Sequence, residues 1–313
     1  MTLDQAKIPL LGGLGNQLFQ LAALLSLDAK SSVLECSWGN ARKTNNLEDI
    51  FYYKIVNGVT RSETKKFRTI LQKGFNFMLR IQLKDLPRAY RWSSCFFWER
   101  AVSLVSRRSY ALRASRELGF VNLRPTKKRS VLLHGYFQTY KYFETSDVKK
   151  KLMGLKLKSP PSAIKQYEQI SIIERPLVVH IRRGDYKLEN NFGILGDRYY
   201  EESLEIMWNK NFYGRIWLFS DEPEEALNVI PEAYRQYIRV IPNLDLVPAA
   251  TLELMRLGLG YIIANSSFSW WGAMLSKHPN PTVIAPNKWF KNLADPACLI
   301  PPGWIKVNSH FES

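Results

Sequence analysis

The sequence predicts an α/β fold in which parallel strands alternate with helices. In the second half of the chain, short apolar runs alternate regularly with segments of helical periodicity. Near the N-terminus, an apolar run enters a glycine-rich turn and a helical pattern follows, which is the first unit of a similar layer. The Ser-Pro-Pro break at residues 159–161 interrupts this order and predicts two domains, residues 1–160 and residues 161–313.

The elements of the first half are inferred from short apolar runs and from one basic amphipathic pattern. We expect strands at residues 8–11, 33–35 and 131–135, and helices at residues 18–29, 62–83 and 143–153. In the segment 62–83, apolar residues recur at helix-like spacings between lysines and arginines.

The second half indicates a doubly wound sheet. We expect strands at residues 177–181, 215–219, 238–240, 261–264 and 282–285, and helices at residues 199–209, 224–229, 250–258 and 269–276. Ligands bind at the carboxyl ends of the strands in such a sheet. Polar motifs follow three of these strands, so they are the candidate functional site.

The composition excludes several classes of protein. The chain has 313 residues and a hydrophobic fraction of 46%, which excludes a disordered or low-complexity protein. Its three cysteines, Cys36, Cys95 and Cys298, are scattered, so we expect reduced thiols in a cytoplasmic protein. We expect neither a secretory signal nor a transmembrane helix, because the apolar runs are too short.

The formal net charge of +16 is concentrated in one segment. Residues 61–130 hold 18 lysines and arginines against four acidic residues, a net charge of +14, together with ten aromatic residues. Such a segment suits a nucleic acid, the surface of an anionic membrane, or simply a solvated basic face. No helix-turn-helix or RNP pattern supports a nucleic acid. We therefore expect no nucleic-acid partner and a peripheral contact with the inner face of the cell membrane.

The first polar motif, residues 180–185 (HIRRGD), ends the strand predicted at 177–181. Strand alternation places His180 and Arg182 on one face and Arg183 on the other. An arginine presents a fork of donors that matches two phosphate oxygens. Asp185 is able to hold an arginine in place or to accept a proton. A surface arginine pair bridged to nearby acids is the alternative interpretation.

The second motif, residues 265–272 (NSSFSWWG), follows the strand predicted at 261–264. Asn265 and Ser266 are good N-caps, and the N–H groups and dipole at a helix start bind phosphate. Phe268, Trp270 or Trp271 is able to stack on a base or a sugar. An ordinary cap above core tryptophans is the alternative.

Two further motifs carry weaker signals. Asp221 and Glu222 end the strand predicted at 215–219, where acids accept hydrogen bonds from ribose or guanine, or cap the next helix. Residues 12–17 (GGLGNQ) resemble a phosphate loop without matching a complete pattern. With four histidines and neither H-E-x-x-H nor D-x-D, we expect no metal site, so arginines and a helix start would neutralise a bound diphosphate.

In this order, the motifs resemble the bacterial form of the inverting α-1,2-fucosyltransferases of glycosyltransferase family eleven. The matching segments are residues 12–20 (GGLGNQLFQ), 135–138 (GYFQ), 141–143 (KYF), 180–185, 219–222 (FSDE), 263–273 (IANSSFSWWGA) and 285–290 (APNKWF). The basic segment 61–130 has no recognisable match.

The resemblance implies a GT-B type fold, with two Rossmann-like domains facing a cleft and a basic helical segment in the N-terminal half. The first domain would face the acceptor, and the second would bind the GDP-sugar. L-fucose would pass from GDP-fucose, without a cofactor or metal, to an oligosaccharide acceptor. The group that accepts the fucose would be the 2-hydroxyl of galactose. The acceptor would belong to a surface polysaccharide or O-antigen and would be carried on a lipid. Another nucleotide-sugar donor, or a basic nucleic-acid-binding protein, stays open as an alternative.

The resemblance also assigns roles to the matching residues. Arg182 would neutralise the β-phosphate of the leaving GDP, Asn16 would face the fucose, and Asp185 is the first candidate for the general base. The donor-binding residues it implies are Gly13, Gly15, His180, Arg183, Asp221, Glu222, Asn265, Ser266, Ser267, Phe268, Ser269 and Trp270. Among these, His180, Asp221 and Glu222 would contact the guanosine.

Overall fold

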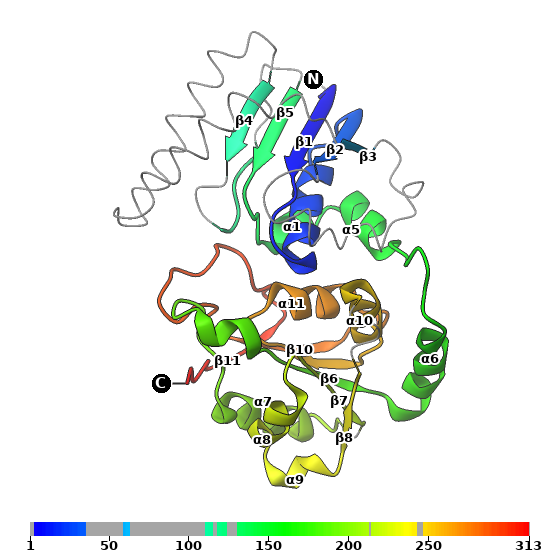
Figure 1. Cartoon of the computed structure of the whole chain (residues 1–313), viewed down its shortest axis with the longest axis vertical. Coiled ribbons are helices and arrows are strands. Elements are labelled where there is room, and N and C mark those ends of the chain that lie inside the picture. The colour runs from blue at the N-terminus through cyan, green and yellow to red at the C-terminus, as the bar shows by residue number, and fades with distance from the viewer. Residues whose placement is uncertain are drawn as a thin grey trace. The chain divides into compact units, whose positions relative to one another are not determined.

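The computed structural model describes residues 3–35, 59–62, 110–114, 118–123, 130–212, 214–242 and 247–312. The described residues form two compact units (Figure 1). The first unit comprises those up to Gly154 and the short segment Ala297–Leu299, and the second comprises those from Leu155 to Pro296 and from Ile300 onwards. The helix expected at 62–83 and most of the basic segment 61–130 lie outside the described residues.

The first unit contains a five-stranded sheet in the order β3-β2-β1-β5-β4, and every pair of neighbours is parallel. Its strands are β1 (Gln5–Pro9), β2 (Ser31–Glu35), β3 (Val59–Ser62), β4 (Tyr110–Ala114) and β5 (Ser130–His134). The helices among its described residues are α1 (Leu14–Leu25), the short 3-10 helix η3 (Tyr140–Tyr142) and α5 (Ser146–Met153). Helix α1 begins four residues before the predicted 18–29, because Gly13 is already its N-cap, with an extended backbone.

The second unit contains a six-stranded sheet in the order β11-β10-β9-β6-β7-β8, again with parallel neighbours throughout. Its strands are β6 (Leu177–Ile181), β7 (Ile216–Ser220), β8 (Ile238–Val240), β9 (Gly260–Ile262), β10 (Thr282–Pro286) and β11 (Ile305–Val307). Its helices are α6 (Ser162–Glu174), η4 (Gly184–Leu188), α7 (Asp197–Asn209), α8 (Pro223–Val229), α9 (Glu232–Arg235), α10 (Pro248–Met255) and α11 (Ser267–Met274). The prediction of parallel α/β sheets is therefore confirmed in both units.

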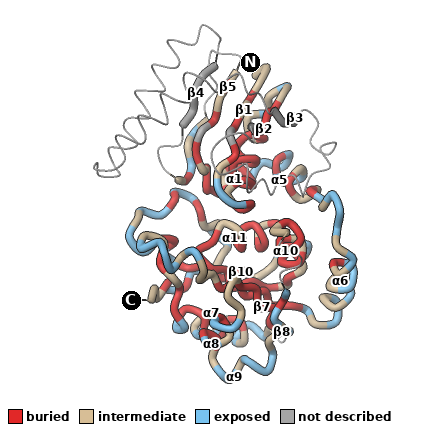
Figure 2. The backbone as a smooth tube through the Cα atoms, in the orientation of Figure 1, coloured by how far each residue is buried: buried red, intermediate tan, exposed pale blue. Residues whose placement is uncertain are grey.

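The core of the second unit lies between the sheet and its helices (Figure 2). Strands β6 and β7 are buried along their whole length. One face of β6 contributes Leu177, Val179 and Ile181 to an apolar cluster. Because this strand is central and its packing is complete, the residues that follow Ile181 start from a rigid position.

Helix α6 was not predicted, and its packing explains why. It begins directly after Pro161, and Ile164 is its one buried residue. A helix that buries a single side chain has no apolar stripe, so its periodicity is weak. Among the described residues, no helix is long and apolar enough to cross a membrane.

Candidate active site

Three of the polar motifs meet at one edge of the second sheet. Strand β6 pairs with β7 on one side and with β9 on the other. The three strands are parallel, so their carboxyl ends lie next to one another. Residues 182–185 and 221–222 follow β6 and β7 directly, and residues 265–268 follow the end of β9 after two intervening residues. This sheet order brings together the motifs that follow β6, β7 and β9, which were predicted to share a site.

Arg182 is the charged centre of this edge. Its Nη2 lies 2.7 Å from Oδ1 of Asp185, and its Nη1 lies 3.2 Å from Oδ2 of Asp221. The guanidinium carbon is 5.6 Å from the centre of the Tyr186 ring. The side chain of Arg182 is still 32% exposed. The structure therefore holds a positive charge in a fixed place where an anion can reach it.

Asp221 ties the two strand ends together. Its Oδ1 accepts a hydrogen bond of 3.1 Å from the backbone N–H of Arg183, while its Oδ2 pairs with Arg182. Gly184 leaves room for this carboxylate, because a Cβ there would collide with Oδ2 of Asp221. This close approach explains why the motif has a glycine at position 184, where a larger residue would not fit. Asp221, which was expected to contact the guanosine, is engaged here with the side chain of Arg182 and the backbone of Arg183.

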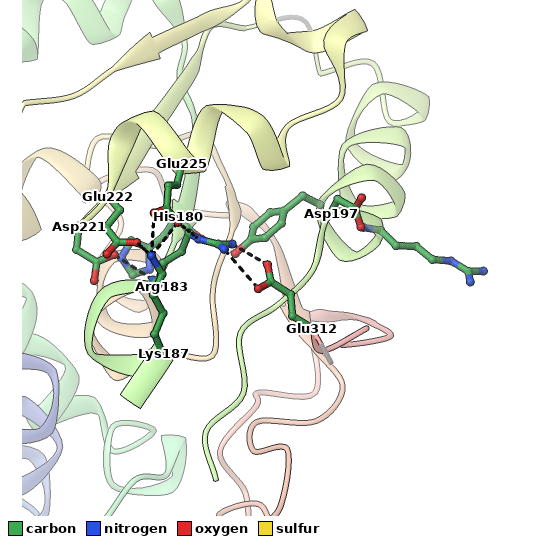
Figure 3. A network of polar contacts seen from close by, with 10 residues as sticks. His180, Arg183, Lys187, Asp197, Asp221, Glu222, Glu225 and Glu312 are labelled. Atoms are coloured by element: carbon green, nitrogen blue, oxygen red, sulfur yellow. Dashed lines mark hydrogen bonds and ion pairs between the residues drawn. The ribbon is translucent and has the colours of Figure 1, made fainter. Parts of the chain in front are cut away.

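The side chain of Arg183 is not brought together with that of Arg182. Its Nη1 and Nη2 lie 2.7 Å and 3.3 Å from the two carboxylate oxygens of Glu312. Its Nε lies 3.0 Å from Glu225, and the side chain is only 13% exposed (Figure 3). Strand alternation predicts this separation of the two arginines. Arg183 was expected to bind the donor, and in the structure its guanidinium pairs with two carboxylates.

Glu222 also forms an ion pair within the protein. Its Oε2 lies 2.6 Å from Nζ of Lys187, which contacts Glu225 at 2.8 Å as well (Figure 3). Hydrogen bonds to Glu222 and Glu225 raise the pKa of Lys187, so the lysine stays charged. The acidic residues after β7 therefore organise the basic side chains from the loop after β6.

His180 lies beneath the charged centre as a neutral base. It is 5% exposed, and its ring centroid is 6.3 Å from that of Phe268. Burial, aided by the positive charge of Arg182, lowers the pKa of His180 to about 3. Its buried Nδ1 has no hydrogen-bond partner among the described residues.

The start of α11 presents the second predicted anion-binding group. Oγ of Ser266 accepts a hydrogen bond of 3.3 Å from the N–H of Phe268, so Ser266 is the N-cap, as predicted. Ser267 and Phe268 are partly exposed in the first turn. The hydroxyl of Tyr186 donates to the carbonyl of Asn265 at 3.0 Å, which fastens the loop after β6 to this helix start. The structure thus places Ser266, Ser267 and Phe268 at the edge.

Two polar residues of this motif, Asn265 and Ser269, lie under the surface. The side-chain amide of Asn265 donates to the carbonyls of Phe192, Gly193 and Trp289, each at 3.1 Å. Ser269 is buried, and its hydroxyl donates to the carbonyl of Ser266 at 3.2 Å. These residues shape the loops around the edge.

Trp270 is fully buried, so no face of its ring is open to a base or a sugar. It packs against Trp271 at 4.8 Å and against Trp304 at 5.6 Å between ring centroids. The alternative of a core tryptophan describes this residue.

Tyr186 was missed by the sequence reasoning, although it contacts both anion-binding groups. It follows Asp185 directly, and its ring also packs 5.1 Å from that of Phe192. An aromatic residue next to an arginine-rich strand end is the signal that could have identified it, because guanidinium groups pack on aromatic faces.

In the first unit, the glycine motif holds Asn16. Gly12 has a φ of +72°, and a Cβ there would lie 2.6 Å from Nδ2 of Asn16. Oδ1 of Asn16 accepts a hydrogen bond of 2.8 Å from Nε2 of Gln138. Gly13 is exposed at the N-cap of α1, whereas Gly15 is buried inside the helix. Asn16 and Gly13 therefore belong to one exposed turn, and Gly15 supports it from within.

Buried Gln20 connects the start of the glycine motif to the loop that follows β5. Its Oε1 accepts from the backbone N–H of Leu11 at 3.0 Å. Its Nε2 donates to the carbonyls of Leu11 at 3.3 Å and Gly135 at 3.1 Å. The segments 12–20 and 135–138, which match the family pattern together, are thus joined by hydrogen bonds.

Comparisons with known proteins agree with this arrangement of motifs. A family model described as "Glycosyl transferase family 11" matches residues 68–308. The chain is 27% identical over 324 residues to "Alpha-1,2-colitosyltransferase" of Escherichia coli, covering 95% of this chain and 97% of the relative. It is also 27% identical over 306 residues to "O-antigen biosynthesis glycosyltransferase WbnK" of the same organism, covering 89% and 93%.

Solved structures with a partly similar fold include fucosyltransferases. Fucosyltransferase NodZ from Bradyrhizobium aligns with a TM-score of 0.47 and 11% identity, covering 88% of this chain and 94% of that one. FUT1 of Arabidopsis thaliana in complex with GDP aligns with a TM-score of 0.49 and 11% identity, covering 90% and 70%.

Proposed function

The chain belongs to glycosyl transferase family 11, and on this premise we propose that it transfers L-fucose from GDP-fucose to a glycan hydroxyl, with inversion at the anomeric carbon. The observation that carries the proposal is the position of Arg182. Its guanidinium is clamped by two carboxylates and remains partly exposed, beside the start of α11. This is a suitable place for the diphosphate of a nucleotide sugar.

The proposed reaction needs positive charge at the leaving group. The bond between the anomeric carbon and the β-phosphate oxygen breaks, and the acceptor oxygen bonds to that carbon from the opposite side. The acceptor's proton passes to a base, and GDP leaves with the electron pair. Donors that are already in position when this charge develops contribute about 10²–10³-fold to the rate. Arg182 and the N–H group of Ser267, at the start of α11, would supply them.

Asp185 was the first candidate for the general base, and its geometry favours a positioning role in the proposed reaction. It is 64% exposed, and its carboxylate pairs with Arg182 at 2.7 Å. A carboxylate in that pair stabilises the arginine's orientation. His180 is not suited to collect the proton, because its pKa of about 3 makes its ring a very weak base.

We also propose that no metal ion is needed, since the guanidinium would neutralise the diphosphate. Transfer by the purified protein should then proceed unchanged in excess EDTA. Restoration of a lost activity by added Mg²⁺ or Mn²⁺ would contradict this part of the proposal.

The acceptor we propose is the 2-hydroxyl of galactose in an O-antigen glycan. The support is the activities of the two relatives, which are named for an α-1,2 linkage and for O-antigen biosynthesis. Because the first relative is a colitosyltransferase, colitose is the main alternative to fucose as the sugar that is transferred. Colitose is fucose without its 3-hydroxyl, so a site for one sugar differs from a site for the other by the groups around a single oxygen.

A donor and acceptor screen tests this proposal. The protein is incubated with GDP-fucose, GDP-colitose and a panel of UDP-sugars, each with galactose-terminated oligosaccharides, and the linkage of any product is determined by NMR. We expect an α-1,2-fucoside and little transfer from UDP-sugars. Faster transfer from GDP-colitose would replace fucose by colitose as the donor sugar. Transfer from UDP-sugars alone would overturn the proposal.

A further inference from the structure

A segment near the end of the sequence lies along the loop that follows the candidate site. Residues His310–Glu312, called the strap below, pair with residues 194–196. The N–H of Gly196 donates to the carbonyl of His310 at 2.9 Å, and the N–H of Glu312 donates to the carbonyl of Ile194 at 2.8 Å. Leu195 and Phe311 form an antiparallel bridge between these contacts. The strap is therefore fixed at both ends by backbone hydrogen bonds.

Side chains lock the strap in place as well. Gly193 has a φ of +75°, and a Cβ there would lie 2.7 Å from the ring of Phe311, so the two pack at the closest approach. Nζ of Lys291 donates to the carbonyl of Glu312 at 2.5 Å. The backbone of Glu312 is thus held in place.

That carboxylate is aimed at Arg183 (Figure 3). Two hydrogen bonds, of 2.7 Å and 3.3 Å, join it to Nη1 and Nη2 of the arginine. Parallel bonds of this kind fix the plane of the guanidinium as well as its position. Arg183 is mostly buried, so water is a poor substitute for the carboxylate.

Arg183 transmits this constraint to the charged centre through its own backbone. Its N–H donates to Oδ1 of Asp221, and Oδ2 of the same carboxylate pairs with Arg182. A shift of Arg183 therefore moves the hydrogen-bond donor that orients Asp221, and with it the carboxylate that holds Arg182.

We propose that Glu312 is a positioning residue for diphosphate binding: through Arg183 and Asp221, it keeps Arg182 in the orientation that meets the nucleotide. This inference rests on the proposed function, because it assumes that Arg182 contacts the diphosphate of GDP. A displacement of about 1 Å at such a group is enough to cost about 10²-fold in rate.

The test compares Glu312→Ala and Glu312→Gln with the unmodified protein and with a matched control. The control is Glu168→Ala. Glu168 lies on α6 in the same unit, and it also forms an ion pair, with Lys277 at 2.8 Å. The dissociation constant of GDP is measured by calorimetry. The constants kcat and KM are measured separately for GDP-fucose and for the acceptor, and the melting temperature is recorded for each variant.

We expect Glu312→Ala to raise both the dissociation constant of GDP and the KM for GDP-fucose by about tenfold or more, with the acceptor KM unchanged. Glu312→Gln keeps one acceptor oxygen for Arg183, so its values should lie between those of Glu312→Ala and the unmodified protein. Glu168→Ala should match the unmodified protein.

Two results would overturn the inference. One is an unchanged GDP affinity and donor KM in both Glu312 variants. The other is a fall in melting temperature and kcat alone, because that would mark Glu312 as a stabilising residue only. If the unmodified protein itself does not bind GDP, the proposed function fails and the inference fails with it, so the two failures are distinguishable.

Discussion

Gly184→Ala is the smallest change that disturbs the charged centre. The added methyl group would occupy the space that Oδ2 of Asp221 now fills. The carboxylate has to move, since it is the more mobile partner in the collision. Its contacts to Arg182 at 3.2 Å and to the N–H of Arg183 at 3.1 Å are then lost or lengthened.

The size of the effect follows from these two contacts. A hydrogen bond to a charged group contributes about 1.5–3 kcal/mol. The side chains of Arg182 and Asp221 are 32% and 24% exposed, so water replaces part of what is lost. We therefore expect about 2 kcal/mol for the two contacts together. If this loss appears in the transition state, kcat/KM for the donor falls about 30-fold.

The assay is steady-state transfer from GDP-fucose, with Gly303→Ala as the control. A Cβ on Gly303 meets nothing within 4 Å, so the control should keep full activity. In an Asp221→Ala background, Gly184→Ala meets no carboxylate and should have little further effect. Equal losses from Gly184→Ala in the two backgrounds would refute the reasoning, as would full activity of the single variant.

Two further predictions concern buried groups. His180 is neutral in the folded protein, with a pKa of about 3, and protonates in the unfolded chain below pH 6.5. The unfolded state therefore binds more protons between these pH values, and the free energy of unfolding falls by about 1.4 kcal/mol for each pH unit of acidification. Urea unfolding at pH 7 and pH 5 should show about 2 kcal/mol more loss in the unmodified protein than in His180→Gln, and identical losses would contradict the stated pKa. In the first unit, Gln138→Glu removes the amide that donates to Oδ1 of Asn16, so kcat for transfer should fall about tenfold while the dissociation constant of GDP stays constant. A loss of GDP affinity in this variant would show that Asn16 does not act at the sugar.

Local sequence patterns predicted most of the strands and helices of the second unit. Strands β6 and β8 occupy the residues predicted for them, residues 177–181 and 238–240. The parallel order followed from their alternation with helices, and it correctly put the motifs after β6, β7 and β9 at one edge. Helix α6 was not predicted, because it buries only Ile164 and so shows little apolar periodicity.

The details of the site depend on partners that are distant in sequence. The family resemblance implied that Arg183 binds the donor, and the structure adds an ion-pair partner, Glu312, that lies 129 positions away. Periodicity says nothing about such a contact. Trp270 follows an N-cap and was expected to be accessible for stacking, whereas the packing of α11 turns its ring into the core. The residue types indicated the chemistry, and the tertiary packing decided which copies of each type are available.

The central claim is that Arg182 neutralises the diphosphate that leaves when fucose is transferred. Its most direct test is the rate of fucose transfer from GDP-fucose by Arg182→Ala, with and without millimolar guanidinium. Removal of a preorganised charge at the leaving group predicts a loss of about 10²-fold or more, with partial recovery when guanidinium enters the vacated position. Transfer by Arg182→Ala at the rate of the unmodified protein would contradict the claim.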